Sequence, residues 1–542
     1  MREQKKRAAV KHGRRFLCRV IFFIFMSAIF LGLAISSLRS FFIEIDRGEG
    51  ILRLIADEKP NMMSETMARR APDLALRGIV NLPDQMLMLM ETSSSFISAD
   101  GVDCIYGSGF KNELRLPPIN VDRHTNIVRC PNPPIDSFPK SIALKSDPAT
   151  QKRHQLFQWD NLAYDALIDG DNTTIVFVKG LNLRPEKLYD PSRFECVFGW
   201  NFTSPKLMLR TEVVSIAQEI VRCKTPLSVL RRSPNSSVRV SVRMIGRKPI
   251  DSIAVPSRAR NSVETKWEMC ICTMLHNQAK FLREWVTYHA SIGVGSFFLY
   301  DNNSNDDIEH VIESLSKVAN ISRTIWPWVK TQEAGFSHCS LRLRGHCKWV
   351  GFIDVDEFFH LPAPNMTLID AVYNQTSAAK NVAELRVPCY IFGPSGLVRE
   401  PPQGVAVGYT CRMGWPERHK SIVNPEAVSS SLINVVHHFH LRDGFEFVVA
   451  NTGILAVNHY KYQVWEVFKE KFYRRVAAYV ADWQKEENVG SKDRTPGLGT
   501  RAVEPPDWSN RFCEKEDDGL REVLLHKFLN SSSNRLPWQT DR

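Results

Sequence analysis

Two aspartates end an apolar run in the second half of the chain. Residues 349–353 lead directly into Asp354, Val355 and Asp356. In an extended backbone, residues two apart point to the same side, so we expect both carboxylates to face one crevice. Two such charges repel each other unless a cation compensates them. Hard oxygen ligands favour Mg²⁺ or Mn²⁺, and either ion can bridge to the oxygens of a diphosphate. An isolated Asp-x-Asp is common, so the surrounding elements decide its meaning.

The segments upstream of the pair alternate between strand and helix patterns. Apolar runs of strand length lie at 267–274, 296–300, 323–328 and 348–353. Helical patterns lie at 278–292, at 308–318 and in a third stretch that ends near residue 345. This β-α-β order predicts an α/β domain with a largely parallel sheet that binds ligands at the carboxyl ends of its strands. The aspartate pair stands at one of these ends.

The N-terminal residues predict a membrane anchor. Residues 20–38 carry no charged side chain and would rise about 28 Å as a helix, close to the hydrocarbon thickness of a bilayer. Eight basic residues precede this stretch, opposed only by Glu3, so residues 1–19 are expected to be cytoplasmic and the rest lumenal. A cleaved signal peptide is the alternative, but no small-residue cleavage site follows. The tail supplies +7 of the formal net charge of +11 and leaves +4, which disfavours nucleic-acid binding.

Cysteines and glycosylation sequons also indicate a secretory compartment. Eleven of the twelve cysteines follow residues 20–38, and such compartments permit disulfides. Because eleven is odd, at least one of them is expected to lack an intramolecular partner. Asn-x-Ser/Thr sequons, which predict a glycoprotein, begin at Asn172, Asn201, Asn235, Asn302, Asn320, Asn365, Asn374 and Asn530.

The region before residue 258 differs from the α/β region in composition and in the pattern of its apolar residues. Residues 39–95 are mixed in charge and rich in Met, and they are interpreted as a stem. Residues 96–258 contain short apolar runs, including 174–179, 194–198 and 238–243, divided by Pro, Asn and Gly. They predict a small β-sandwich-like domain with disulfides Cys196–Cys223 and Cys104–Cys130. Such a domain can bind glycan or act as a spacer, and both interpretations stay open.

Four segments resemble motifs of glycosyltransferase family 92 and occur in the same order along the chain. They are residues 266–277, 280–289, 300–304 and 352–358, and the last reads Phe-Ile-Asp-Val-Asp-Glu-Phe. The resemblance covers about residues 265–530, and the family's plant members include β-1,4-galactan synthases. It implies a GT-A fold, a UDP-sugar donor (UDP-galactose), an inverting mechanism and a single-pass type II Golgi membrane protein. The β-rich region can correspond to the carbohydrate-binding-like domain of those synthases.

The resemblance also implies roles for single residues. GT-A enzymes often take a third metal ligand from late in the domain, which fits His459, although an ordinary hydrogen-bonded histidine is the alternative. Thr273 and Asn277 follow the first strand, and Asp301 follows the second, where uracil and ribose would lie. An Asn/Asp-rich loop after a strand also forms turns without any ligand.

The basic run at 418–421 suggests a second donor contact. His419 and Lys420 are cationic donors suited to a departing diphosphate, and a solvated basic surface is the alternative. Further along, His437, His438 and His440 resemble a zinc cluster. The alternation of residues 435–441 instead indicates a strand whose neighbours face opposite ways, so substrate-lining or structural roles are favoured over zinc.

An inverting transfer needs a general base near the acceptor hydroxyl. Glu417 and Asp443 are the predicted bases by region and residue type, and either can be a surface carboxylate. Trp415 and Trp328 can stack on sugar rings, although a core or surface position is the default for tryptophan.

The sequence therefore predicts a Golgi-membrane glycosyltransferase with a lumenal domain. It would use Mn²⁺ or Mg²⁺ to transfer a hexose from a UDP-sugar onto a glycan or cell-wall polysaccharide, and homodimerisation stays open. The alternatives are a noncatalytic glycan-binding scaffold and a lumenal hydrolase of sugar nucleotides. No sequence feature fixes the acceptor or the linkage.

Overall fold

The structure is a computed structural model. It describes residues 76–90, 101–108, 112–122, 126–134, 137–144, 154–184, 187–202, 204–231, 238–258, 266–435, 437–479 and 503–539. These residues belong to one compact unit, Pro72–Arg542. Among them, no helix has the length and apolar character needed to cross a membrane. The predicted cytoplasmic tail and the predicted anchor at 20–38 lie outside the described residues.

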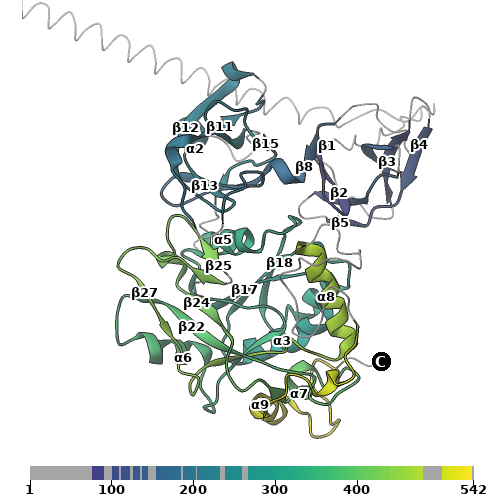
Figure 1. Cartoon of the computed structure of the whole chain (residues 1–542), viewed down its shortest axis with the longest axis vertical. Helices are drawn as coiled ribbons and strands as arrows, with labels where there is room; N and C mark the ends of the chain where they lie inside the picture. Colours follow the sequence, from purple (N-terminus) through teal and green to yellow (C-terminus); the bar gives the residue numbers. More distant parts are fainter. Residues whose placement is uncertain are drawn as a thin grey trace, which may run out of the picture. The chain divides into compact units, whose positions relative to one another are not determined.

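A mixed sheet forms the centre of the C-terminal half (Figure 1). Its first four strands are parallel in the order β19-β18-β17-β20. They are β17 (Trp267–Leu275), β18 (Ser296–Asp301), β19 (Asn320–Ile325) and β20 (Cys347–Phe352). The sheet continues through β24 (Arg418–Val423), β22 (Val382–Ile391), β28 (Ala456–His459) and β21 (Glu357–His360), with β27 (Glu446–Val449) also paired to β22. β24 and β21 run antiparallel to their neighbours. The predicted parallel arrangement is therefore confirmed for the first four strands, and the sheet is mixed beyond them.

In the C-terminal half, helices alternate with strands along the chain. They are α3 (Ala279–Ser291), α4 (Ile308–Leu315), α5 (Gln332–Leu343), α6 (Leu368–Thr376), α7 (Val405–Gly408), α8 (Trp465–Tyr479) and α9 (Gly519–Phe528). The three predicted upstream helices are therefore present. α4 ends earlier than predicted, which leaves Val318 48% exposed. β19 lies three residues before its predicted position.

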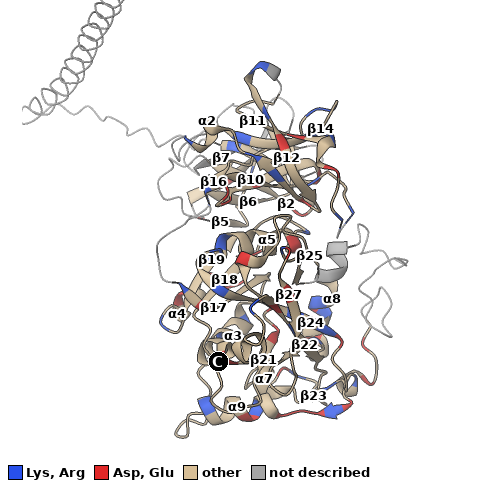
Figure 2. Cartoon of the chain, turned by 90° about the vertical axis from the view of Figure 1, so that its left-hand side faces the viewer, with Lys and Arg blue, Asp and Glu red and all other residues tan. Residues whose placement is uncertain are grey.

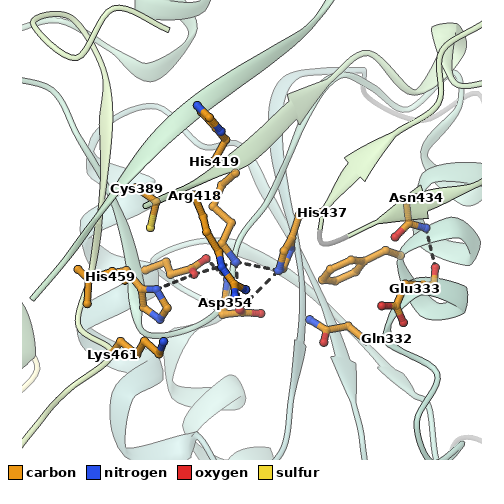
Figure 3. Close-up of a pocket in the computed structure, with 14 residues that line it drawn as sticks. Gln332, Glu333, Asp354, Cys389, Arg418, His419, Asn434, His437, His459 and Lys461 are labelled. Carbon is orange, nitrogen blue, oxygen red and sulfur yellow. Dashed lines mark hydrogen bonds and ion pairs between the residues drawn. The ribbon is translucent and has the colours of Figure 1, made fainter. Parts of the chain in front are cut away.

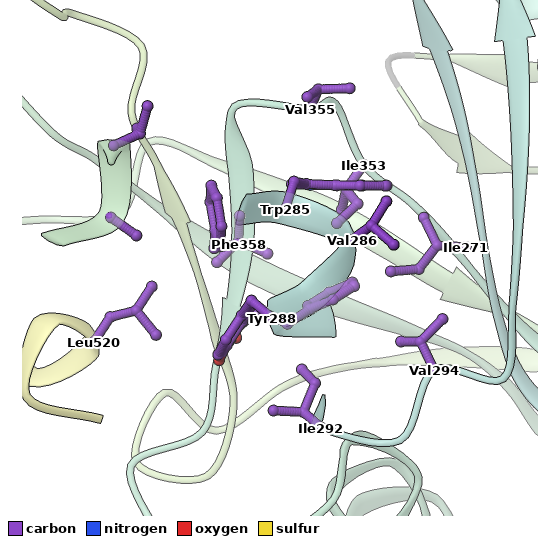
Figure 4. Packing of buried hydrophobic residues seen from close by; sticks show 14 of the residues in the cluster. Ile271, Trp285, Val286, Tyr288, Ile292, Val294, Ile353, Val355, Phe358 and Leu520 are labelled. Carbon is purple, nitrogen blue, oxygen red and sulfur yellow. The ribbon is translucent and has the colours of Figure 1, made fainter. Parts of the chain in front are cut away.

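Alternation along the strands divides the interior into two cores. In β17, Met269 and Ile271 join the core on the α3 side, whereas Cys270 and Cys272 join the core on the α5 side. Figure 4 shows the first core, in which side chains of α3 such as Trp285 and Tyr288 pack near Ile271, Ile353 and Phe358. A sheet covered on both faces requires such continuous apolar strands.

The N-terminal described residues form two groups of strands. The first contains β1 (Leu76–Asn81), β2 (Gln85–Met90), β3 (Val102–Ser108), β4 (Asn112–Leu116), β5 (Asn120–Asp122), β6 (Ile127–Pro131), β7 (Phe138–Leu144) and β8 (Leu156–Gln158). The second is an eight-stranded sheet of β9 (Leu162–Ile168), β10 (Thr173–Val178), β11 (Phe194–Gly199), β12 (Met208–Ala217), β13 (Ile220–Lys224), β14 (Arg239–Met244), β15 (Asp251–Ser252) and β16 (Ser257–Arg258).

The predicted boundary of the stem at residue 95 differs from the structure. β1 and β2 fall inside the predicted stem, and every residue of β2 is buried. Its three methionines gave no strand signal because Met fills irregular core space without a β preference. The β-rich region therefore begins by Leu76 and comprises two sheet systems rather than one sandwich.

Five disulfides link the described cysteines. Cys104–Cys130 and Cys196–Cys223 confirm the two predicted pairs. The others are Cys270–Cys347, Cys272–Cys339 and Cys411–Cys513. Cys389 is the free cysteine among the described residues, and it is buried. Figure 2 shows acidic and basic residues intermingled along the described chain, in keeping with the small net charge that remains beyond the N-terminal tail.

Candidate active site

A tight turn after β20 gathers three carboxylates. Glu357 N donates to Asp354 O at 3.0 Å, and Asp354 N donates to Glu357 Oε2 at 2.9 Å. Carboxylate oxygens of Asp354, Asp356 and Glu357 lie within 4.8 Å of one another. The predicted convergence of Asp354 and Asp356 is therefore present, but a turn produces it. β20 ends at Phe352, so the two residues do not share an extended strand.

Two lysines compensate these charges. Lys420 Nζ lies 3.2 Å from Asp354 Oδ2 and 2.8 Å from Glu357 Oε1. Lys471 of α8 forms an ion pair with Asp356. Burial raises the pKa of both aspartates, but Lys420 acts on Asp354 and Lys471 on Asp356 strongly enough to bring each net pKa below its usual value. Both aspartates are therefore ionised.

Glu357 lies at the centre of the group. It is fully buried at the start of β21, directly opposite His459 of β28. Burial raises the pKa of Glu357 to about 8, and the negative charges of Asp354 and Asp356 add to the effect of burial against the opposing effect of Lys420. His459 Nδ1 lies 3.4 Å from Glu357 Oε1, and His459 Nε2 lies 3.3 Å from Asp356 Oδ2. The imidazole therefore joins the two carboxylates.

The group opens into a cavity of about 170 Å³. Asp354, Glu357 and His459 line it together with Arg418 and Lys461. Arg418 points towards Asp354 in Figure 3. The cavity thus contains carboxylates on one part of its wall and additional cationic side chains on another, which suits a metal ion together with an anionic ligand.

Of the two predicted diphosphate contacts, one faces the carboxylates. In β24 alternate residues share a face, so Lys420 faces the acidic group together with Arg418. His419 also belongs to the lining but points away from Asp354 (Figure 3). Within the basic run at 418–421, strand alternation thus places Arg418 and Lys420 on the side of the carboxylates and His419 on the other side. Lys420, held by Asp354 and Glu357, is committed to the carboxylates rather than to a ligand.

The donor atoms fit a hard divalent cation. Asp354 and Asp356 supply carboxylate oxygens that lie close together, and the Nε2 atom of His459 lies 3.3 Å from Asp356 Oδ2. Burial lowers the pKa of His459 to about 4, so its imidazole is neutral near pH 7 and has a lone pair to give. This oxygen-rich set with one imidazole suits Mn²⁺ or Mg²⁺.

Of the three predicted nucleotide contacts, Asp301 and Asn277 have partners within the protein. Asp301 is 1% exposed, and its carboxylate accepts hydrogen bonds from the guanidinium of Arg323 at 2.6 and 2.9 Å and from Ser304 N at 2.9 Å. Asn277 Oδ1 accepts from Asn305 N at 2.7 Å. Thr273 is fully buried on the α3 side of β17. None of Thr273, Asn277 and Asp301 lines the cavity. The loop after β18 uses the polar groups of Asp301 and Asn277 for its own turns.

The two predicted bases lie elsewhere. Glu417 is exposed just before β24 and does not line the cavity. Asp443 lines a different cavity, which also contains Asp169 and Arg344. Glu333, in the first turn of α5, does line the cavity. Among the described residues, its carboxylate has no hydrogen bond or ion pair, whereas those of Asp354 and Glu357 face Lys420.

The three clustered histidines separate in space. β25 (Asn434–Val435) and β26 (His438–Phe439) form a hairpin rather than the single predicted strand. His437, at its turn with φ 73°, reaches the cavity, where its Nε2 lies 2.7 Å from Lys420 Nζ. His438 Nδ1 faces Glu384 at 3.5 Å, so no shared zinc site exists among these described histidines.

The two tryptophans also differ in setting. Trp328 is buried and stacks on Trp159 at 5.5 Å between ring centroids. Trp415 is 83% exposed. Only Trp415 therefore remains available to a sugar ring.

The chain matches glycosyltransferases along nearly all of its length. The profile of glycosyltransferase family 92 matches residues 265–489. A family 92 protein from Ricinus communis is 52% identical over 559 aligned residues, which cover 99% of this chain and 100% of that protein. Family 92 proteins from Oryza sativa and Arabidopsis thaliana are 47% and 45% identical, over 86% and 87% of this chain and 83% and 85% of theirs. The chain belongs to glycosyltransferase family 92, and the predicted resemblance is confirmed.

Solved structures are similar to smaller parts of the chain. A Staphylococcus aureus TarS fragment matches 39% of this chain and 65% of its own length, with 13% identity and a TM-score of 0.22. Glucosyl-3-phosphoglycerate synthase from Mycobacterium tuberculosis, solved with Mn²⁺ and uridine diphosphate, matches 30% of this chain and 58% of its own, with 14% identity and a TM-score of 0.18.

Proposed function

We propose that this family 92 glycosyltransferase is a metal-dependent, inverting enzyme that transfers a hexose from a UDP-sugar to a glycan. UDP-galactose is the proposed donor, and a cell-wall polysaccharide is the proposed acceptor class. The observation that carries the proposal is the group of carboxylates formed by Asp354, Asp356 and Glu357, with His459 Nε2 3.3 Å from Asp356 Oδ2. Asp354, Glu357 and His459 line a cavity that also contains cationic side chains. A metal site beside a place for a diphosphate is what transfer from a nucleotide sugar requires.

The residues in and around the cavity have different proposed roles. Asp354, Asp356 and His459 would hold Mn²⁺ or Mg²⁺, and a bound divalent ion neutralises the diphosphate leaving group. Arg418 and Lys461 bind diphosphate oxygens directly. Lys420 remains on Asp354 and Glu357, and Lys471 remains on Asp356. Together the two lysines reduce the repulsion between the three neighbouring carboxyl groups. The chain's own residues thus prepare a site of balanced charge for an anionic donor.

Glu333 is the proposed general base in place of Glu417 and Asp443. A base must reach the acceptor hydroxyl and must be able to accept its proton. Glu333 lines the cavity, and its carboxylate is not engaged by a described cation. Removal of the acceptor proton by Glu333 would accompany attack of that oxygen on the anomeric carbon, while the bond to the diphosphate breaks. Attack from the face opposite the leaving group inverts the anomeric centre.

The cellular setting is part of the proposal. The uncharged residues 20–38 with a basic N-terminal flank support a single-pass type II protein of the Golgi membrane with its catalytic domain in the lumen. Protease protection of the C-terminal half in sealed Golgi vesicles tests this topology. Degradation of that half without detergent would contradict it.

The activity test uses the full chain purified in detergent, with Mn²⁺, a panel of UDP-sugars and an array of oligosaccharide acceptors. We expect UDP release that depends on acceptor, with a product heavier by one hexose. UDP-sugar cleavage that yields free sugar without an acceptor would favour the hydrolase. Glycan binding without any turnover would favour the scaffold.

The metal site is tested with the double variant Asp354→Ala/Asp356→Ala. We expect transfer to fall by at least about a hundredfold, since removal of a main electrostatic contributor to transition-state stabilisation has effects of this size. Asp443→Ala, which removes an exposed carboxylate from the other cavity, is the matched control and should retain activity. Normal turnover by the double variant, verified as folded by circular dichroism, would refute the site.

A further inference from the structure

Strand pairing brings three different ligand types together beneath the carboxylate group. Glu357 of β21 lies directly opposite His459 of β28. On the other side of β28, His459 pairs with Ile391 of β22, and Cys389 lies two residues earlier on the same face of that strand. Ligand atoms of Glu357, Cys389 and His459 all lie within 4.8 Å of one another. Three adjacent strands thus present an oxygen, a sulfur and a nitrogen atom to one point.

The sulfur atom is available for coordination. Cys389 is the described cysteine without a disulfide, and it is 1% exposed at the wall of the cavity. Its thiol points towards the imidazole of His459 in Figure 3. Burial, with a further contribution from Glu357, holds the pKa of this thiol well above its usual value. Alkylating reagents, which need a thiolate, are therefore poor probes, whereas a thiophilic metal ion can displace the thiol proton as it binds.

The two nitrogen atoms of His459 face two different sets of partners. Nε2 faces Asp356 at 3.3 Å, and Nδ1 faces Glu357 at 3.4 Å. A neutral imidazole has one nitrogen with a lone pair and one with a proton. When Nε2 binds a metal, Nδ1 must carry the proton and can donate it to Glu357. When Nδ1 binds a metal, Nε2 must carry the proton.

We propose that Cys389, Glu357 and Nδ1 of His459 form a second metal site, selective for a thiophilic d¹⁰ cation such as Zn²⁺ or Cd²⁺. The donor set of one sulfur, one nitrogen and one oxygen is typical of tetrahedral zinc, with the fourth position left for water. Binding replaces the S–H bond with an S–Zn bond and releases the thiol proton to solvent, together with the proton of Glu357 where that carboxyl is protonated, without any change of oxidation state.

The second site and the proposed catalytic metal site exclude each other. Zn²⁺ on Nδ1 moves the imidazole proton to Nε2, which then donates to Asp356 and has no lone pair for Mn²⁺. Zn²⁺ is therefore an inhibitor that competes with Mn²⁺ through a shared histidine. This inhibitory consequence rests on the proposed function, whereas the binding of Zn²⁺ does not.

Binding is tested on the full chain with Cys18→Ser, which removes the remaining cysteine outside the five disulfides. One equivalent of Zn²⁺ should give an X-ray absorption spectrum with one sulfur neighbour at about 2.3 Å and nitrogen or oxygen neighbours at about 2.0 Å. Cd²⁺ should give an ultraviolet thiolate charge-transfer band. A Zn²⁺ spectrum with nitrogen and oxygen neighbours only would overturn the site, and this result does not depend on how a site variant folds.

Cys389→Ser supplies the second test. We expect its Cd²⁺ affinity to fall about tenfold or more, with loss of the band, since loss of one ligand weakens a metal site at least this much. In transfer assays, the Zn²⁺ concentration for half-inhibition should rise as the Mn²⁺ concentration is raised. For Cys389→Ser it should be about tenfold higher than for the wild type, with inhibition of each protein measured against its own rate without Zn²⁺. Inhibition unaffected by Mn²⁺ would overturn the competition. If Zn²⁺ binds through sulfur but no transfer is found, the proposed function fails while the second site stands.

Discussion

Glu357 joins groups that come from three other segments of the chain. It contacts the backbone of Asp354, the ammonium of Lys420 and the imidazole of His459. Carboxylates that orient a metal-ligating histidine typically change metal affinity by about 10- to 100-fold when they are mutated. We expect Glu357→Gln to raise the Mn²⁺ concentration for half-maximal transfer at least about tenfold, with a smaller effect on the rate at saturating Mn²⁺. Steady-state rates over a Mn²⁺ titration measure this split.

Glu384→Gln is the matched control for this prediction. Glu384 is also a fully buried carboxylate of the same sheet, but its partners are Ser421, Arg386 and His438. We expect this variant to lose stability without a change in its Mn²⁺ requirement. An equal shift of the Mn²⁺ requirement in both variants would show that general disturbance of the sheet, and not loss of the histidine contact, is the cause.

At the residue scale, chemical type predicted some site members and burial decided the rest. Asp354 and Asp356 converge because both directly follow an apolar strand, a pattern visible in the sequence. His459 lies beside Asp356 because β28 pairs with β21, which local sequence does not reveal. Asp301 carries the right chemistry for a ribose, yet Arg323 occupies its carboxylate, and that pairing depends on the contact between β18 and β19. Lys471 lies in an ordinary helical stretch, so no local signal indicated its ion pair with Asp356.

At the element scale, His289 ties α3 to β21. Its Nδ1 lies 2.8 Å from Trp285 O, and its Nε2 accepts a hydrogen bond from Phe359 N at 3.3 Å. Only the neutral ring satisfies both contacts. Burial lowers the pKa of His289 to about 3, whereas in the unfolded chain it is about 6.5. The unfolded state therefore binds more protons in between, and the stabilising contribution present above about pH 6.5 is lost as the pH falls.

This linkage predicts a measurable pH dependence. Between about pH 7.5 and pH 5, the wild type should lose about 2 kcal/mol of unfolding free energy through His289. His289→Gln is expected to be less stable at neutral pH but to lack this loss, so the difference between the two proteins shrinks in acid. Urea unfolding at a series of pH values measures it, with the exposed His310 of α4 replaced by Gln as the control. A constant difference across the range would contradict the assignment.

Hydrophobic periodicity predicted the helices and strands that have one buried face. α3 and β17 lie within two residues of their predicted bounds because long apolar patterns specify them. The hairpin of β25 and β26 was missed because Val435 to Leu441 alternates as a strand does, and the positive φ of His437 has no local signature. β2 was missed because its methionines are neutral between strand and helix. Tertiary contacts, not local preference, decide such segments.

At the scale of the whole molecule, the β-rich region and the α/β region share several polar contacts. Arg129 Nη1 donates to Ser304 O at 2.9 Å, and Lys179 Nζ donates to Lys330 O at 3.0 Å. Arg222 Nε donates to Ser430 O at 2.8 Å. None of these pairings can be read from sequence, because each joins residues more than 140 positions apart through side chains that would also suit a solvated surface.

Asp169 is the centre of the most buried of these contacts. Its Oδ2 lies 3.0 Å from Arg222 Nη1 and 2.8 Å from Arg344 Nη1, and both Asp169 and Arg222 are buried. Burial raises the pKa of Asp169, but the two guanidinium groups outweigh it and hold the net pKa below its usual value. Removal of this charge leaves two arginines close together with too little compensation, and loss of one partner of a buried pair costs about 3 to 5 kcal/mol.

We therefore expect Asp169→Asn to lower the unfolding free energy by about 3 kcal/mol or more. Asp171→Asn is a stringent control, because Asp171 contacts the same Nη1 atom of Arg222 at 3.1 Å but is 56% exposed. Exposed ion pairs contribute about 1 kcal/mol or less, so this variant should unfold near the wild-type midpoint. Guanidinium titrations followed by tryptophan fluorescence compare the two. Equal losses in both variants would mean that the number of ion pairs on Arg222, rather than their burial, determines how firmly the two regions are joined.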